Sequence, residues 1–178
     1  MTSIYRNVNY SQGGLFIFFV GVCGLNIKTA LFRGINSLSI DAKGRMAIPS
    51  RYRKYLQAFC DGELIITIDP EHCLLIYPLP EWEVIEQKLN ALPTLNKQVR
   101  KLQRLLIGHA TEVQIDNNGR ILVPSTLRAF AGVEKKVVLV GQGNKFELWD
   151  EVTWNQCREE WLEESIEGLP PELGSLSL

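Results

Sequence analysis

Two short motifs of the form D-x-x-G-R contain the side chains whose types and spacing suggest a chemical role. Each motif is followed, after two further residues, by an apolar β-branched residue and a proline. A carboxylate at the entry of a tight turn accepts hydrogen bonds from the turn N–H groups, and glycine permits the chain reversal. The arginine then follows the reversal, where its guanidinium can project from the surface. The six residues are Asp41, Gly44 and Arg45 in the first motif, and Asp116, Gly119 and Arg120 in the second.

Arginine at the end of a hairpin turn is well suited to nucleic-acid binding. Its planar guanidinium donates two parallel hydrogen bonds to O6 and N7 of guanine, or to a phosphate. A two-stranded ribbon fits the major groove of B-DNA, so a pair of such hairpins can enter it. The motifs therefore predict that double-stranded DNA is the partner. Further cations close to the first motif are expected to neutralise phosphates; they are Lys43, Arg51, Arg53 and Lys54.

Two other interpretations of the motif remain open from the residues alone. Asp41 and Arg45 can simply form an exposed ion pair that closes a turn, although a duplicated arginine favours a two-fold DNA-binding site. Alternatively, Asp41 and Asp116 form a repeated pair of carboxylates, as in some enzymes. Neither aspartate is followed by a hydroxyl residue and glycine, and the chain shows no persuasive nucleophile–base pair and no phosphate-binding glycine loop. We therefore expect that the protein is not an enzyme.

The cysteines and histidines give no indication of a metal site. The four cysteines are scattered without a C-x-x-C pair, which is typical of buried thiols in a reducing compartment. His72 and His109 are isolated from other ligand residues, so the paired spacing of a zinc site is missing. We expect no metal and no cofactor.

Both motifs lie inside an internal repeat, which defines the architecture that must position them. Residues 37–53 align with residues 112–128 at seven identical positions, and the similarity resumes downstream, where Trp82 corresponds to Trp154. Alternating apolar residues and turn dipeptides predict two strands, a short helix and two more strands in each repeat. The predicted elements are 38–41, 45–48, 50–58, 64–68 and 74–77 in the first repeat, and 113–116, 120–123, 125–131, 137–140 and 146–149 in the second.

Helical segments are predicted between and after the repeats, at 81–92, 95–107 and from 152 towards 165. The order of elements predicts an α+β fold with internal pseudo-symmetry. The corresponding division of the chain is an N-terminal extension (1–30), a first repeat (35–82), connecting helices (83–110), a second repeat (111–154), and a C-terminal helix and tail (155–178).

Overall composition is that of a globular chain, and the charges are unevenly distributed. The 178 residues are 46% hydrophobic and 22% charged, with a net charge of −1. Basic clusters lie at 43–54 and 97–104, whereas 159–172 is acidic, a distribution compatible with a nucleic-acid face. The apolar run at 14–25 is shorter than the roughly 20 residues that a membrane span needs, so no membrane association is expected.

The two motif segments, DAKGRMAIPSRYR and DNNGRILVPSTLR, resemble the paired SpoVT/AbrB-type units of the MraZ family of transcriptional regulators. The segments CLLIYPLPEWEVIEQKL and VVLVGQGNKFELWDEVTW are also similar to that family, so the resemblance runs from about residue 31 to the C-terminus. It implies swapped-hairpin β units, two per chain, which form an intrachain pseudo-dimer. It also implies a ring-shaped homo-oligomer that is cytoplasmic and nucleoid-associated, and that represses the division and cell-wall gene cluster by binding upstream direct repeats.

The resemblance places the family's DNA-contacting arginine at Arg45 and its counterpart at Arg120. From their positions, we extend the expected DNA-binding set to Lys43, Arg51, Arg53 and Arg128. The second repeat is less basic, because Asn118 replaces Lys43 and other cations are also missing, so the first repeat is expected to dominate DNA binding. A ring-forming assembly or partner-binding protein with little specific DNA binding is the alternative function.

The N-terminus departs from the family pattern. Family members typically begin M-F-R-G, and Leu31-Phe32-Arg33-Gly34 stands at that place here. A leucine codon can serve as a bacterial start, so one interpretation of residues 1–30 is an extension produced by an upstream choice of start codon. A packed or disordered extension and a weak targeting segment are the alternatives.

Overall fold

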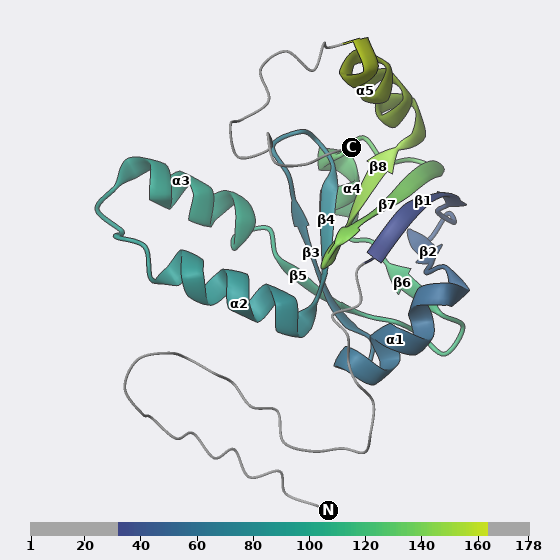
Figure 1. The fold of residues 1–178 in the computed structure, drawn as a ribbon, viewed down its shortest axis with the longest axis horizontal. Coiled ribbons are helices and arrows are strands. Elements are labelled where there is room, and N and C mark those ends of the chain that lie inside the picture. Colours follow the sequence, from purple (N-terminus) through teal and green to yellow (C-terminus); the bar gives the residue numbers. More distant parts are fainter. Residues whose placement is uncertain (1–31, 164–178) are drawn as a thin grey trace, which may run out of the picture.

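The computed structural model describes residues 32–163. The predicted N-terminal extension (1–30) and the tail from residue 164 lie outside the described residues. Figure 1 shows the described part as a central sheet with helices on both of its faces, an α+β arrangement. Each repeat contributes strand, strand, helix, strand, strand in that order, as the sequence predicts.

The elements follow the predicted order, with some shifts in their bounds. The first repeat contains β1 (Phe32–Ser39), β2 (Arg45–Ala47), α1 (Ser50–Cys60), β3 (Glu63–Ile68) and β4 (Leu74–Pro78). The connection contains α2 (Leu79–Asn90) and α3 (Lys97–Leu106). The second repeat contains β5 (Thr111–Gln114), β6 (Arg120–Leu122), α4 (Ser125–Phe130), β7 (Lys136–Gly143) and β8 (Lys145–Asp150), and α5 (Glu151–Glu163) follows it.

The first strand is longer than the alternating pattern predicts. β1 begins at Phe32, whereas the alternation indicated a strand only from residue 38. The additional residues pair with the long β7, from Phe32 opposite Gly143 to Ser39 opposite Lys136. Phe32 is 3% exposed and packs edge-on against Tyr52 of α1. The greater length of β1 therefore depends on its pairing with β7 of the other repeat, which the sequence of β1 does not indicate.

The two repeats exchange their first strands. In the larger sheet the strand order is β1-β7-β8-β4-β3-β5, so β1 of the first repeat pairs with β7 of the second, and β5 of the second pairs with β3 of the first. The second strands, β2 and β6, pair with each other in a separate two-stranded sheet. Each repeat therefore completes the sheet of the other.

Apolar residues fill both faces of the six-stranded sheet. On one face, α1, α4 and the β2–β6 sheet cover a core that contains Met46, Ile121 and Phe146, each fully buried. On the other face, Trp82, Trp149 and Trp154 belong to a second core, together with residues of α2, α3 and α5. Because successive strand residues point to opposite faces, the near-continuous apolar runs of β3 and β4 suit strands covered on both sides.

Prolines and one left-handed residue set the ends of the first helix. Pro49 precedes α1 and Pro124 precedes α4 with nearly the same backbone angles, so the two helices start in the same way. Asp61 then ends α1 in the left-handed conformation, at φ 51°. The chain can reverse there into β3 because this conformation closes the last helical turn. Among residues 32–163, no helix is both long enough and apolar enough to cross a membrane.

The β2–β6 pair offers a test of the shared core. We expect Ile121→Ala to lower the free energy of unfolding by about 2–5 kcal/mol, since truncation of a buried isoleucine leaves a cavity. Leu122→Ala, at the next position, is the matched control. Leu122 is 54% exposed, so its loss should change stability by no more than about 0.5 kcal/mol. Urea unfolding of both variants measures the difference, and equal losses would contradict this account of the core.

Candidate nucleic-acid interface

The first turn is built around the carboxylate of Asp41. Its Oδ1 accepts hydrogen bonds from the backbone N–H groups of Lys43 and Arg45, both at 2.9 Å. Its Oδ2 accepts from the Arg45 side chain, at 2.8 Å from Nε and 2.7 Å from Nη2. The N–H of Gly44 donates to the Asp41 carbonyl, and glycine accommodates the φ of 84° there. One side chain thus fixes both the turn and the direction of the arginine.

The second turn repeats this arrangement. Asp116 Oδ1 accepts from the backbone N–H groups of Asn118 and Arg120, at 2.8 and 2.9 Å. Its Oδ2 accepts from Nε and Nη2 of Arg120, at 3.0 and 2.9 Å. Gly119 has a φ of 74°. The duplicated motif therefore produces two turns with the same hydrogen bonds, as the sequence predicts.

Both arginines keep one edge of the guanidinium available. The Asp41 carboxylate contacts Nε and Nη2 of Arg45. Nη1 of Arg45 makes no hydrogen bond to a described residue. The Nη1–Nη2 edge can therefore donate two parallel hydrogen bonds to a guanine or a phosphate. The side chains of Arg45 and Arg120 are 34% and 31% exposed. They are held in place on one side and open to solvent on the other.

Two more predicted cations lie against the turn of the opposite repeat. The guanidinium of Arg53 lies directly over Gly119, and that of Arg128 lies over Gly44. A hydrogen bond from Nε to a backbone carbonyl orients each guanidinium. Arg53 donates to the Ile48 carbonyl, and Arg128 donates to the Val123 carbonyl. A side chain on either glycine would meet an arginine. Arg53 and Arg128 therefore brace the turn of the other repeat, and each is only half exposed.

The remaining predicted cations differ in their surroundings. Arg51 donates from Nη2 to Asn36 Oδ1 at 2.9 Å and to the Arg33 carbonyl at 3.3 Å, so it packs on β1 away from the first turn. Lys43 lies at the tip of the first turn, is exposed, and has no side-chain partner among the described residues. Lys54, a seventh predicted cation, is likewise exposed and has no side-chain partner among the described residues, so Lys43 and Lys54 have the least constrained charges.

Backbone hydrogen bonds tie the two turns together. The N–H of Ile48 donates to the Gly119 carbonyl at 2.9 Å, and the N–H of Val123 donates to the Gly44 carbonyl at 2.8 Å. Ile48 and Val123 are both fully buried. The sequence motif includes these two positions, which match in type between the repeats, but sequence reasoning did not predict their hydrogen bonds to the opposite turn.

The hydrogen bonds of the turns also determine the charge of the aspartates. The backbone N–H of Arg45, followed by its guanidinium, lowers the pKa of Asp41 from 3.8 to about 2. The backbone N–H of Arg120 is likewise the main cause that lowers the pKa of Asp116. Both carboxylates therefore stay ionised, and able to hold the arginines, at a lower pH than an unperturbed aspartate would.

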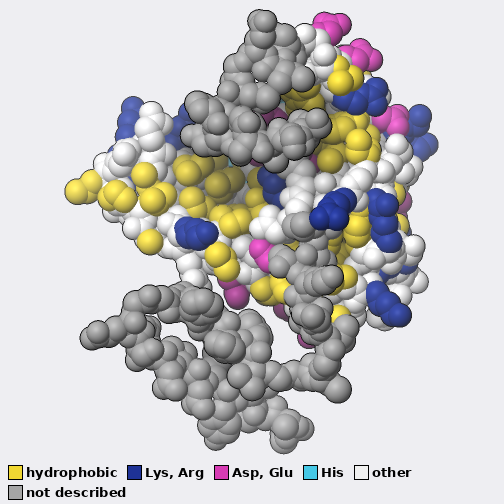
Figure 2. Space-filling model, viewed as in Figure 1, with side chains coloured by type: hydrophobic (Ala, Val, Ile, Leu, Met, Phe, Trp, Pro, Cys, Tyr) yellow, Lys and Arg dark blue, Asp and Glu magenta, His cyan; other side chains and the backbone are white. Residues whose placement is uncertain are grey.

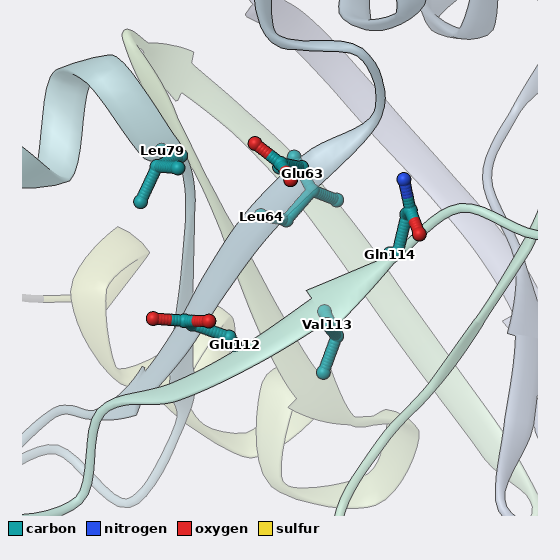
Figure 3. A pocket seen from close by; sticks show the side chains of 6 residues that line it. All are labelled: Glu63, Leu64, Leu79, Glu112, Val113 and Gln114. Carbon is teal, nitrogen blue, oxygen red and sulfur yellow. The ribbon is translucent and has the colours of Figure 1, made fainter.

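The described residues offer little else that suggests a chemical site. They contain no group of three or more His, Cys, Asp or Glu side chains that could hold a metal ion. Figure 3 shows a hollow lined by residues of β3, β5 and the first residue of α2, where the carboxylates of Glu63 and Glu112 lie near apolar side chains such as Leu79. No hydroxyl, thiol or imidazole lines this hollow.

The fold and the turns define a class of two-repeat α+β protein, in which exchanged strands present a pair of aspartate-held arginines. The MraZ family model, described as an antitoxin-like MraZ protein, matches residues 31–105 and again residues 106–170. The chain therefore belongs to the MraZ family of transcriptional regulators, and it is not an enzyme. The family predicted from the sequence is confirmed.

Curated relatives agree with this assignment over most of the chain. A protein of Methylococcus capsulatus is 60% identical over 151 residues, which cover 83% of this chain and 99% of the relative. Proteins of Thioalkalivibrio sulfidiphilus and Coxiella burnetii are 59% and 56% identical, and the match covers 83% of this chain and the whole of each relative. All three bear the name transcriptional regulator MraZ.

The lowered pKa of Asp41 predicts a specific titration. In the folded protein the Asp41 carboxyl carbon should titrate at about pH 2 by NMR, against 3.8 for an unperturbed group. Because the pKa is lower in the folded state, the stability that Asp41 contributes is complete above pH 3.8 and is lost as the pH falls through about 2. In Arg45→Ala the pKa should rise but stay below 3.8, since the backbone donors remain. A wild-type value of 3.8 would disprove the carboxylate's role.

The contact between Arg53 and Gly119 predicts a second effect. Gly119 and Gly132 both have positive φ, so alanine is strained at either position by roughly 1–2 kcal/mol. Only at Gly119 would the new Cβ overlap a guanidinium, because nothing lies within 4 Å at Gly132. We expect Gly119→Ala to cost about 1–3 kcal/mol more than Gly132→Ala in urea unfolding. Equal costs would show that Arg53 moves away freely.

Proposed function

We propose that this chain is a sequence-specific DNA-binding transcriptional repressor whose turns at Arg45 and Arg120 contact base edges. The observation that supports this proposal is the paired, aspartate-held guanidinium with one free donor edge. Pre-oriented donors lose little conformational freedom on binding, so more of the interaction energy appears as affinity. We interpret the exchanged strands as the swapped-hairpin pseudo-dimer expected for the family. In it, the two similar arginine-bearing turns face the same DNA.

The partner is double-stranded DNA, and the proposed target is the set of direct repeats upstream of the division and cell-wall gene cluster. This target follows from the family resemblance, as does a location in the cytoplasm at the nucleoid. Lys43 is proposed to contact a phosphate close to the bases that Arg45 contacts, and Arg51, which packs on β1, a phosphate farther along the DNA backbone. Arg53 and Arg128 are proposed to act on DNA binding chiefly by holding the opposite turn.

Self-assembly into a ring is the second part of the proposal. Helices α2 and α3 and the segment that joins them expose apolar side chains: Val84 is 46% exposed, Leu95 93% and Leu102 39%. Figure 2 shows apolar side chains, in yellow, gathered in the region of α2 and α3. Such a patch suits an interface between copies of the chain. In a ring, several turns would meet several DNA repeats at once, and avidity would raise the overall affinity.

The same apolar surface favours the alternative, an assembly or partner-binding protein with little specific DNA binding. The two functions differ in what Arg45 does. In a DNA-binding repressor Arg45 contributes affinity without affecting the assembly. In an assembly protein, the turn contributes at most to the fold.

We expect Arg45→Ala to abolish preference for the upstream DNA over a scrambled duplex, at a cost of about 1–3 kcal/mol of discrimination. Arg120→Ala should have a smaller effect, because its repeat is less basic. The full chain would be titrated into both duplexes by fluorescence anisotropy, with its size followed by light scattering. Arg158→Ala is the matched control, since Arg158 is an exposed arginine on α5. Equal binding of the wild type to both duplexes, or no binding, would refute the repressor and leave the assembly function.

A further inference from the structure

The strand exchange gives each turn a neighbour from the other repeat. The N–H of Ile40, which precedes Asp41, donates to the carbonyl of Lys135 at 2.9 Å. At the equivalent place in the second turn, the N–H of Ile115 donates to the carbonyl of Gly62, also at 2.9 Å. We name residues 134–136 the first flank, because they lie beside the first turn, and residues 61–63 the second flank. Each flank belongs to the repeat that does not contain the turn.

The two flanks occupy equivalent positions but differ in charge. The pairings of Ser39 with Lys136 and of Gln114 with Glu63 show that Lys136 and Glu63 are structural counterparts. By the same register Lys135 corresponds to Gly62. The flanks share one acidic residue, since Glu134 and Asp61 also correspond. The first flank therefore adds two cations next to its turn, where the second flank has a glycine and a carboxylate.

The strand ends next to the flanks increase this difference. Glu112 of β5 stands where β1 has Ser37. Figure 3 shows Glu63 on β3 and Glu112 on the neighbouring β5, the strand at the edge of the sheet, close to Gln114, which is two residues before Asp116. No described cation pairs with either carboxylate. A phosphate backbone that approached the second turn along this edge would therefore meet negative charge.

Lys135 is the cation of the first flank that is free to bind a phosphate. Lys136 has a partial partner, because its Nζ lies 3.5 Å from Glu151 Oε2. Lys135 is exposed, and no hydrogen bond or ion pair of its side chain occurs among the described residues. Its backbone carbonyl accepts a hydrogen bond from the N–H of Ile40, the residue before Asp41, so Lys135 lies beside the first turn.

We propose that Lys135, from the second repeat, is a phosphate-contacting residue of the first turn, and that the acidic second flank directs the DNA backbone towards the first turn. This inference rests on the proposed DNA-binding function and adds a residue to its interface. A lysine is a compact, flexible charge that binds phosphate without recognising a base. Lys135 therefore contributes affinity and position, while Arg45 contributes specificity.

A salt titration distinguishes this role from a structural one. Each phosphate contact contributes about 0.9 to the slope of log affinity against log salt. Loss of one contact in Lys135→Ala should lower that slope by about 0.9, so a fourfold rise in salt would weaken the variant by about 3.5-fold less than the wild type. Affinities for the upstream and scrambled duplexes should fall by the same factor. Lys135→Arg should restore the slope, and Arg158→Ala should leave it unchanged.

The reciprocal variant is Glu63→Lys, which gives the second flank the charge of the first. It should raise affinity for both duplexes and increase the slope. Circular dichroism and thermal unfolding verify that each variant is folded. A wild-type slope in Lys135→Ala, in a protein whose specific binding is lost in Arg45→Ala, would overturn the role of Lys135 and leave the proposed function standing. A wild type that binds neither duplex would overturn both.

Discussion

The exchange of first strands between the repeats is the constraint on which the rest of the structure depends. Because β1 pairs with β7 and β5 with β3, neither repeat can complete a sheet by itself. The β2–β6 pair lies between the exchanged strands and buries Met46 and Ile121 completely. The two turns are the chain reversals that this arrangement requires. Backbone hydrogen bonds with the opposite repeat fix the backbone of each turn, so each turn depends on the folding of both repeats.

This constraint explains why the interface arginines can be rigid although they are exposed. An isolated surface ion pair contributes little, since holding two side chains in one geometry costs entropy. Here Asp41 is already fixed by two backbone N–H groups, so only the arginine side chain must be ordered. The bond to the carboxylate occupies the Nε side of Arg45 and leaves the other edge for DNA. The carboxylate also offsets part of the arginine's charge, which leaves phosphate attraction to lysines nearby.

Much of this architecture could be predicted from the sequence, because its signals are local. The Asp–Gly–Arg turns and the proline before each short helix follow from residue types and their spacing. The choice of strand partners could not be predicted from pattern alone, because a period of two indicates which face of a strand is buried and not which strand lies beside it. With two similar repeats, pairing within a repeat and between repeats satisfies the same pattern. For this reason Arg53 was expected beside the first turn, whereas it lies over Gly119.

The strand exchange also determines which equivalent positions of the two repeats must have similar residues and which can differ in charge. Positions that face the shared core match in type between the repeats, as Ile48 and Val123 do, because both fill the same apolar layer. The flanks are exposed, and a change from Glu63 to Lys136 at equivalent places costs the fold little, since surface substitutions rarely alter stability by more than about 0.5 kcal/mol. Charge can therefore diverge between two turns of identical geometry. Because each flank comes from the opposite repeat, the electrostatic character of a turn is set by residues outside its own repeat.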